Sequence, residues 1–198
     1  MHRTGETPLE RVVAVYEGAK AILSDSHHVN LRALDAMVRS LRVGAELRGF
    51  AEVSTQMRQW SRELHAAVQQ VTGFSAEQVS MVSAFEKRRR LIKLLAAASE
   101  EPAAQRLLAQ TLAQAKLETE YTETALKKLK RSVRSSLEDL QQLGLMACVL
   151  STSAQIEAAA GGSSADDLTL VSRDFAQRSE KVTENIRQML ASDRQVDS

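Results

Sequence analysis

Apolar and small residues recur at helical spacing along most of this 198-residue chain, and the pattern is most regular between residues 102 and 160. There the steps alternate between four and three residues, which makes a seven-residue repeat. Such a repeat is typical of a long helix that packs through one seam in a supercoil, and it predicts a rod roughly 85–90 Å long. The predicted seam consists of Leu108, Leu112, Ala115, Thr119, Thr122, Leu126, Leu129, Val133, Ser136, Leu140, Leu143, Ala147, Leu150 and Ala154.

The few glycines and prolines separate four predicted helices, at residues 8–45, 49–98, 102–160 and 165–194. Pro8 follows Thr7, a good N-cap, and glycines or Pro102 stand at the later breaks. Gly73 precedes a further capping pattern inside the second helix. Two alternatives therefore stay open: residues 74–125 extend as a two-helix coil, or the chain folds back at Gly73.

These helices predict an all-α fold, an elongated antiparallel four-helix bundle or coiled coil made of two fused helical hairpins. Up-down-up-down connectivity through short turns should place both hairpin turns at one end and Pro102 at the other. Because the first and last helices are shorter than the middle two, the four-helix section should lie at the end with the two turns. The predicted parts are an N-terminal tail at residues 1–7, a first hairpin at 8–98 with its turn at 44–49, and a second hairpin at 99–198 with its turn at 161–164, together one bundle domain.

The amino-acid composition excludes several classes of fold and of binding partner. Eight glycines and two prolines are too few for most β-rich folds, which use these residues at their turns. The formal net charge of +1 gives no overall attraction to nucleic acid. A single cysteine excludes an intramolecular disulfide, and no apolar run reaches the roughly 18–20 residues that span a membrane. The first residues lack the apolar core of a signal peptide, so we expect a cytoplasmic protein without a membrane span.

The chain shows no spacing that indicates catalysis or a metal site. It contains no nucleophile paired with a base at a familiar spacing and no glycine-rich phosphate loop. His27 and His28 are adjacent and face different sides of a helix, so they cannot share a metal ion, and His65 lies on another helix. Cys148 flanks the seam and is expected to be a small buried residue. We predict no catalytic residue, no metal and no cofactor.

Two basic runs lie at residues 87–93 and 127–134. Basic runs can contact acidic lipid, an acidic partner or nucleic acid, but these runs contain no interleaved aromatic residues on which bases could stack. Their acidic neighbours favour two solvated faces of a rod. No nucleic-acid partner is expected.

One segment carries a family resemblance. It reads Val29-Asn30-Leu31-Arg32-Ala33-Leu34-Asp35-Ala36-Met37-Val38, then Arg42-Val43-Gly44, then Leu47-Arg48-Gly49-Phe50-Ala51-Glu52-Val53. Without a gap, residues 29–64 resemble the cytoplasmic hairpin tip of methyl-accepting chemotaxis receptors. In that family the segment is the membrane-distal tip of a long antiparallel coiled coil. Two such hairpins dimerise into a four-helix bundle, and the tips bind a coupling protein and a histidine kinase.

The second half of the chain is similar to the same tip, more weakly, at residues 154–161 and 174–179, with at least one residue missing near the turn. The resemblance therefore implies a tandem duplication, in which one polypeptide forms the bundle that a receptor forms by dimerising. Glu157 of the second copy would then lie close enough to pair with Arg39 or Arg42 of the first.

The resemblance implies a partner-binding surface at the tip, where the chain differs from the family by carrying Arg39, Ala45 and Glu52. The leading hypothesis is a non-catalytic signalling or scaffold protein. It would contact a coupling protein, histidine kinase or receptors in chemotaxis-like signal transduction. The alternative is a coiled-coil structural or assembly protein that kept the scaffold, lost kinase coupling and self-associates. The implied partner-binding residues are Asn30, Leu31, Leu34, Arg42, Arg48, Gly49, Phe50, Val53 and Glu157.

Overall fold

The computed structural model describes the whole chain except residues 1–7, 45–46, 99–101, 163–164 and 195–198. The described residues form four α-helices and no strand, which confirms the predicted all-α fold. Each end of a helix lies within two residues of its prediction, and the predicted cap Thr7 lies outside the described residues. The helices are α1 (Pro8–Val43), α2 (Arg48–Ala98), α3 (Pro102–Ala159) and α4 (Ala165–Arg194).

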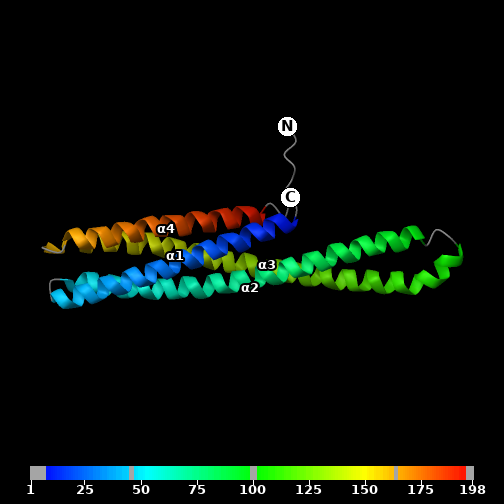
Figure 1. Cartoon of the computed structure of the whole chain (residues 1–198), viewed down its shortest axis with the longest axis horizontal. Coiled ribbons are helices and arrows are strands. Elements are labelled where there is room, and N and C mark those ends of the chain that lie inside the picture. The colour runs from blue at the N-terminus through cyan, green and yellow to red at the C-terminus, as the bar shows by residue number, and fades with distance from the viewer. Residues whose placement is uncertain (1–7, 45–46, 99–101, 163–164, 195–198) are drawn as a thin grey trace, which may run out of the picture.

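The helices run along one rod (Figure 1). Each helix packs against its neighbours in the chain, and α1 also packs against α4, which closes a four-helix ring. Both hairpin turns lie at one end, as predicted, and α2 and α3 continue past α1 and α4 at the other (Figure 1). α2 passes through Gly73 without interruption, so the chain does not fold back there, and the described parts of α2 and α3 beyond the ends of α1 and α4 extend as a two-helix coil. We call residues 79–98 and 102–128 the arm. No helix in the described part of the chain is long and apolar enough to cross a membrane.

The predicted seam of α3 is confirmed, because every seam residue is buried or half-buried. In the four-helix part a third position of the repeat also enters the core. The residues at this position are Leu137, Gly144, Ser151 and Ala158, all buried. In the arm the same position carries Lys116 and Glu123, both exposed, so the change in chemistry marks where two helices become four.

Cys148 was expected to be buried and is exposed, because it lies about 100° around the helix from the seam residue Ala147.

The two hairpins repeat one another in three dimensions, because buried residues of the first correspond to buried residues 118 positions later in the second. Such pairs are Val15 with Val133, Ala36 with Ala154, Phe50 with Leu168, Val53 with Val171 and Val68 with Ile186. Both hairpins turn at a glycine with positive φ, Gly44 at 102° and Gly162 at 55°, and these glycines are separated by the same interval. The register therefore continues through the turn, and the expectation of a missing residue there is wrong.

Trp60 connects the two hairpins inside the core. Its side chain on α2 is buried, and the indole Nε1 donates a hydrogen bond of 2.8 Å to the backbone oxygen of Leu143 on α3. The ring also meets Phe175 of α4 edge-on, with centroids 5.7 Å apart and ring planes at 85°. One side chain of the first hairpin thus contacts both helices of the second.

Trp60→Ala should lower the free energy of unfolding by about 3–5 kcal/mol, because it leaves a large cavity among three helices. Trp60→Phe keeps a ring against Phe175 and loses the hydrogen bond to Leu143, so the expected loss is smaller, about 1–2 kcal/mol. Since Trp60 is the only tryptophan in the sequence, urea unfolding should be followed by circular dichroism. Equal losses for the two variants would contradict a dominant role for packing volume.

The arm should open more readily than the four-helix part. Apart from Ala115, its described side chains are half-buried or exposed, whereas α2 carries a fully buried row between residues 50 and 71. Hydrogen exchange followed by mass spectrometry should show residues 79–98 exchanging faster than residues 50–71 of the same helix. Similar protection in the two segments would show that the arm is held by contacts beyond this two-helix seam.

Candidate functional site

The predicted partner-binding residues all lie at the end of the bundle that carries the two hairpin turns. We call the described residues of this end, 29–44, 47–54, 147–162 and 165–172, the tip. The structure separates the nine residues by exposure, which decides which of them can meet a partner. Leu31, Leu34, Arg42 and Arg48 are exposed, Asn30, Gly49 and Glu157 are half-buried, and Phe50 and Val53 are buried.

Phe50 and Val53 pack inside the tip. Phe50 is 0% exposed and belongs to a small apolar cluster with Leu47 and Leu168, separate from the main core. Val53 is 7% exposed and belongs to the main core. Because Phe50 joins the first turn of α2 to the first turn of α4, it holds the two hairpin turns together. These two residues support the surface of the tip and do not form it.

Gly49 allows the two hairpins to approach closely. A Cβ atom at this position would overlap the carboxylate of Glu157 on α3, which is the end of a flexible side chain and would have to move. The φ of Gly49 is not positive, so backbone conformation does not require the glycine. The expected pairing of Arg39 with Glu157 is not formed. Arg39 instead pairs with Asp35 of α1 at 3.0 Å and with Asp167 of α4 at 3.8 Å.

An exposed apolar stripe runs along α1 toward the turn. Leu31, Leu34, Val38 and Leu41 follow one another at steps of three and four residues, so they share one side of the helix. Their side chains are between 37% and 66% exposed. The family resemblance pointed to Leu31 and Leu34 and missed the other two, whose signal in the sequence is this spacing.

The second hairpin carries a matching pair of exposed apolar residues. Val149 and Ile156 of α3 stand 118 positions after Leu31 and Val38, and both are exposed. Since α1 packs on α2 and α4, and α3 packs on the same two helices, α1 and α3 are opposite corners of the ring. The tip therefore presents exposed apolar residues on two different sides, but the side of α3 is less apolar, because Thr152 and Ala159 stand where α1 has Leu34 and Leu41.

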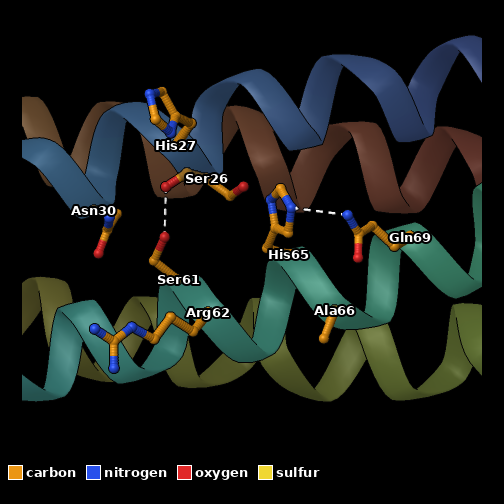
Figure 2. Close-up of a pocket in the computed structure, with 8 residues that line it drawn as sticks. All are labelled: Ser26, His27, Asn30, Ser61, Arg62, His65, Ala66 and Gln69. Atoms are coloured by element: carbon orange, nitrogen blue, oxygen red, sulfur yellow. Dashed lines mark hydrogen bonds between the residues drawn. The ribbon is translucent and has the colours of Figure 1, made fainter.

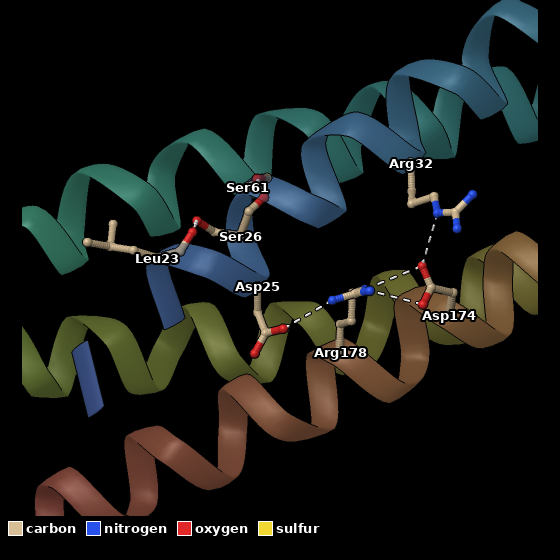
Figure 3. A network of polar contacts seen from close by, with 7 residues as sticks. All are labelled: Leu23, Asp25, Ser26, Arg32, Ser61, Asp174 and Arg178. Atoms are coloured by element: carbon tan, nitrogen blue, oxygen red, sulfur yellow. Dashed lines mark hydrogen bonds and ion pairs between the residues drawn. The ribbon is translucent and has the colours of Figure 1, made fainter. Parts of the chain in front are cut away.

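A polar network joins α1 to α4 just behind the tip (Figure 3). Arg178 Nη1 lies 3.2 Å from Asp25 of α1, and its Nε lies 3.2 Å from Asp174 on its own helix. Asp174 also lies 3.5 Å from Arg32 Nε. Because Asp25, Asp174 and Arg178 are partly buried, solvent screens their attraction less than that of surface pairs. The pair within α4 is visible in the sequence as a four-residue spacing, but the contact across 153 residues is not.

A polar groove of about 300 Å³ lies between α1 and α2 (Figure 2). His27, Asn30, Arg62 and His65 contribute to its lining, so histidines from two helices share one groove. The Oδ1 atom of Asn30 is buried without a hydrogen bond, and His65 Nε2 lies 3.1 Å from Gln69 Nε2. The groove offers hydrogen-bonding groups to a small polar molecule. Among the described residues, no three His, Cys, Asp or Glu side chains are grouped as ligands of a metal ion would be.

Arg178→Met should lower the free energy of unfolding by about 1–3 kcal/mol, because it leaves Asp25 and Asp174 partly buried without their cation. Arg187→Met is the matched control on the same helix. Its side chain is 70% exposed and pairs with Glu184 at the surface, so the loss should stay below about 0.5 kcal/mol. Urea unfolding at low and high salt measures both variants, and equal losses would contradict a structural role for the network.

Comparisons with known proteins add no family assignment. No protein-family model matches the chain, and neither the curated proteins nor the solved structures include a match. The fold and the tip therefore rest on the sequence and geometry of this chain.

Proposed function

We propose that this protein is a non-catalytic cytoplasmic signalling or scaffold protein that acts through protein–protein contacts at its tip, in a chemotaxis-like signalling system. The observation that carries the proposal is the exposed apolar stripe of α1, formed by Leu31, Leu34, Val38 and Leu41. Apolar side chains that are exposed together and bordered by charge are typical of protein-binding surfaces. Val149 and Ile156 on α3 support it in part, because exposed apolar residues recur there at two of the four positions.

Arg42 follows Leu41 at the end of this stripe, and Arg48 begins the next helix at the same end of the bundle. Both are exposed, and neither forms an ion pair with a residue in the described part of the chain. Arg39 is already paired with two aspartates, so its charge is less available to a partner. An apolar stripe with two unpaired guanidinium groups at the same end of the bundle suits a partner that presents apolar side chains and carboxylates.

The family resemblance suggests which partners to test. In the chemoreceptor family, tips of this kind bind the coupling protein, the histidine kinase and other receptors. Glu52 stands where that family has an apolar residue, and here it is exposed and accepts a hydrogen bond from Gln56. The apolar part of the proposed contact therefore lies on α1, and the start of α2 contributes polar groups, Arg48 among them.

Replacing Leu31 and Leu41 together by glutamine should weaken capture of the purified coupling protein or kinase of the same organism by roughly tenfold or more, since the two most exposed apolar side chains of the stripe are lost. Arg48→Glu should weaken capture separately, by reversing a charge at the same end of the bundle. Leu117→Gln is the matched control, because it makes the same exchange at an exposed leucine on the arm. A pull-down with titrated partner gives the apparent affinities.

Undiminished capture by the tip variants would contradict a contact at the tip. The alternative, a structural or assembly protein, predicts self-association that light scattering detects and that tip substitutions leave unchanged. Phe50→Ala is unsuitable for this comparison, because Phe50 is buried and its loss would disturb the tip itself.

A further inference from the structure

The arm has two faces that differ in their chemistry. Its half-buried residues form the seam between α2 and α3, and the exposed residues on either side of that seam form the faces. On one of these faces, basic and large apolar side chains stand together, three or four residues apart along each helix. This face, which we call the basic–apolar face, is formed by Lys87, Leu91 and Leu94 of α2 and by Tyr121 and Lys128 of α3, with Arg90 and Leu117 at its outer border, opposite the seam, all exposed.

One ion pair shows that both helices contribute to this face. Arg88 Nη2 lies 3.2 Å from a carboxylate oxygen of Glu118, and Arg88 Nη1 donates a hydrogen bond of 2.9 Å to Thr122 Oγ1. Leu91 follows Arg88 by three residues, and Tyr121 follows Glu118 by three residues, so each lies one turn from the pair on its own helix. The ion pair of Arg88 with Glu118 therefore lies between the exposed side chains of α2 and those of α3.

Positive charge on the basic–apolar face is not balanced. Lys87, Arg90 and Lys128 form no ion pair with any residue that the structure describes. The acidic residue on this side, Glu118, is neutralised by Arg88. The four large apolar side chains of the face are between 48% and 79% exposed. The face thus combines unpaired cations with apolar surface that no other helix covers.

The opposite face of the arm has mixed charge. It carries Glu86, Arg89 and Lys93 of α2 and Lys116, Glu120, Glu123 and Lys127 of α3. Lys127 Nζ lies 2.8 Å from Glu123, and the hydrogen bond from this ammonium lowers the pKa of the Glu123 carboxyl. The basic run at residues 87–93 was expected to lie on solvated faces of a rod, and Lys87, Arg89, Arg90 and Lys93 are exposed. The structure adds that the run is divided between two faces of different chemistry.

We propose that the basic–apolar face binds the surface of a membrane that contains anionic lipid. Leucines bordered by lysine and arginine are typical of helices that lie in a lipid–water interface, where apolar side chains enter the boundary and long basic side chains reach the headgroups. Tyr121 suits this depth, because its ring is apolar and its hydroxyl is polar. Nucleic acid would engage the charges through its phosphates and leave the apolar side chains uncovered. The binding is peripheral and does not depend on the function proposed for the tip.

Sedimentation of the full-length protein with vesicles tests this surface. Binding should be weak with phosphatidylcholine alone, should rise when phosphatidylserine is added, and should fall with salt. Lys87→Glu with Arg90→Glu should weaken binding by about tenfold or more. Arg89→Glu with Lys93→Glu is the matched control, with the same change of charge on the same helix but on the mixed face, and its loss should be several-fold smaller. Circular dichroism confirms that both variants fold.

A second pair of variants separates apolar insertion from attraction of charge. Leu91→Gln with Leu94→Gln changes no charge and should weaken binding to the anionic vesicles several-fold, whereas Leu31→Gln with Leu41→Gln at the tip should not. Equal losses for the two charge-reversed pairs, or no loss for the leucine pair on the arm, would show a general response to positive charge and would overturn the proposal. Failure of the wild-type protein to bind the anionic vesicles would overturn it as well, and an acidic protein partner would then fit the face better.

Discussion

The unequal length of the helices is the constraint on which the rest of the structure depends. A helix in a two-helix coil buries two positions of each seven-residue repeat, whereas a helix with two neighbours in a bundle buries a third. α3 is 58 residues long and passes from one environment to the other. The residues at the third position of its repeat change accordingly, from Lys116 and Glu123 in the arm to Leu137 and Gly144 in the bundle. The charges also oppose completion of the arm by a second copy on that side, because they would lose their hydration.

The two hairpins meet along two interfaces of different character. α2 and α3 meet through Trp60 and the apolar seam, while α1 and α4 meet at the partly buried ion pairs of Arg178. Burial of apolar surface changes little with moderate salt, but attraction between partly exposed charges is screened. The interface between α1 and α4 therefore depends more on solution conditions than the interface between α2 and α3. The separate cluster around Phe50 closes the tip independently of both.

Much of the fold could be predicted because its signals are periodic and local. The seven-residue repeat identified the seam of α3, and scarce glycines and prolines marked the ends of the helices. The exposed residues of the tip were harder to predict, because a family motif indicates a region and not the direction of each side chain. Phe50 and Val53 belong to the motif and point into the core, whereas Val38 and Leu41 lie outside the predicted set and are exposed. The contact of Arg178 with Asp25 depends on the packing of distant segments, so spacing could not reveal it.

The tip and the arm are joined physically by α2 and α3, which among the four helices are the two that reach both ends. Any mechanical influence of one end on the other must pass through these two helices and the seam between them. Gly73 stands in α2 just before the arm begins, and the space around its Cα is open, so no close contact there requires a glycine. A glycine inside a helix costs about 1 kcal/mol relative to alanine, so Gly73 lowers the intrinsic propensity of α2. The helix is nevertheless continuous, because Val71 and Ser75 on either side are buried and Phe74 packs against the main core. Tertiary packing in the four-helix part therefore holds α2 across this position, and the tip and the arm stay joined by one continuous helix.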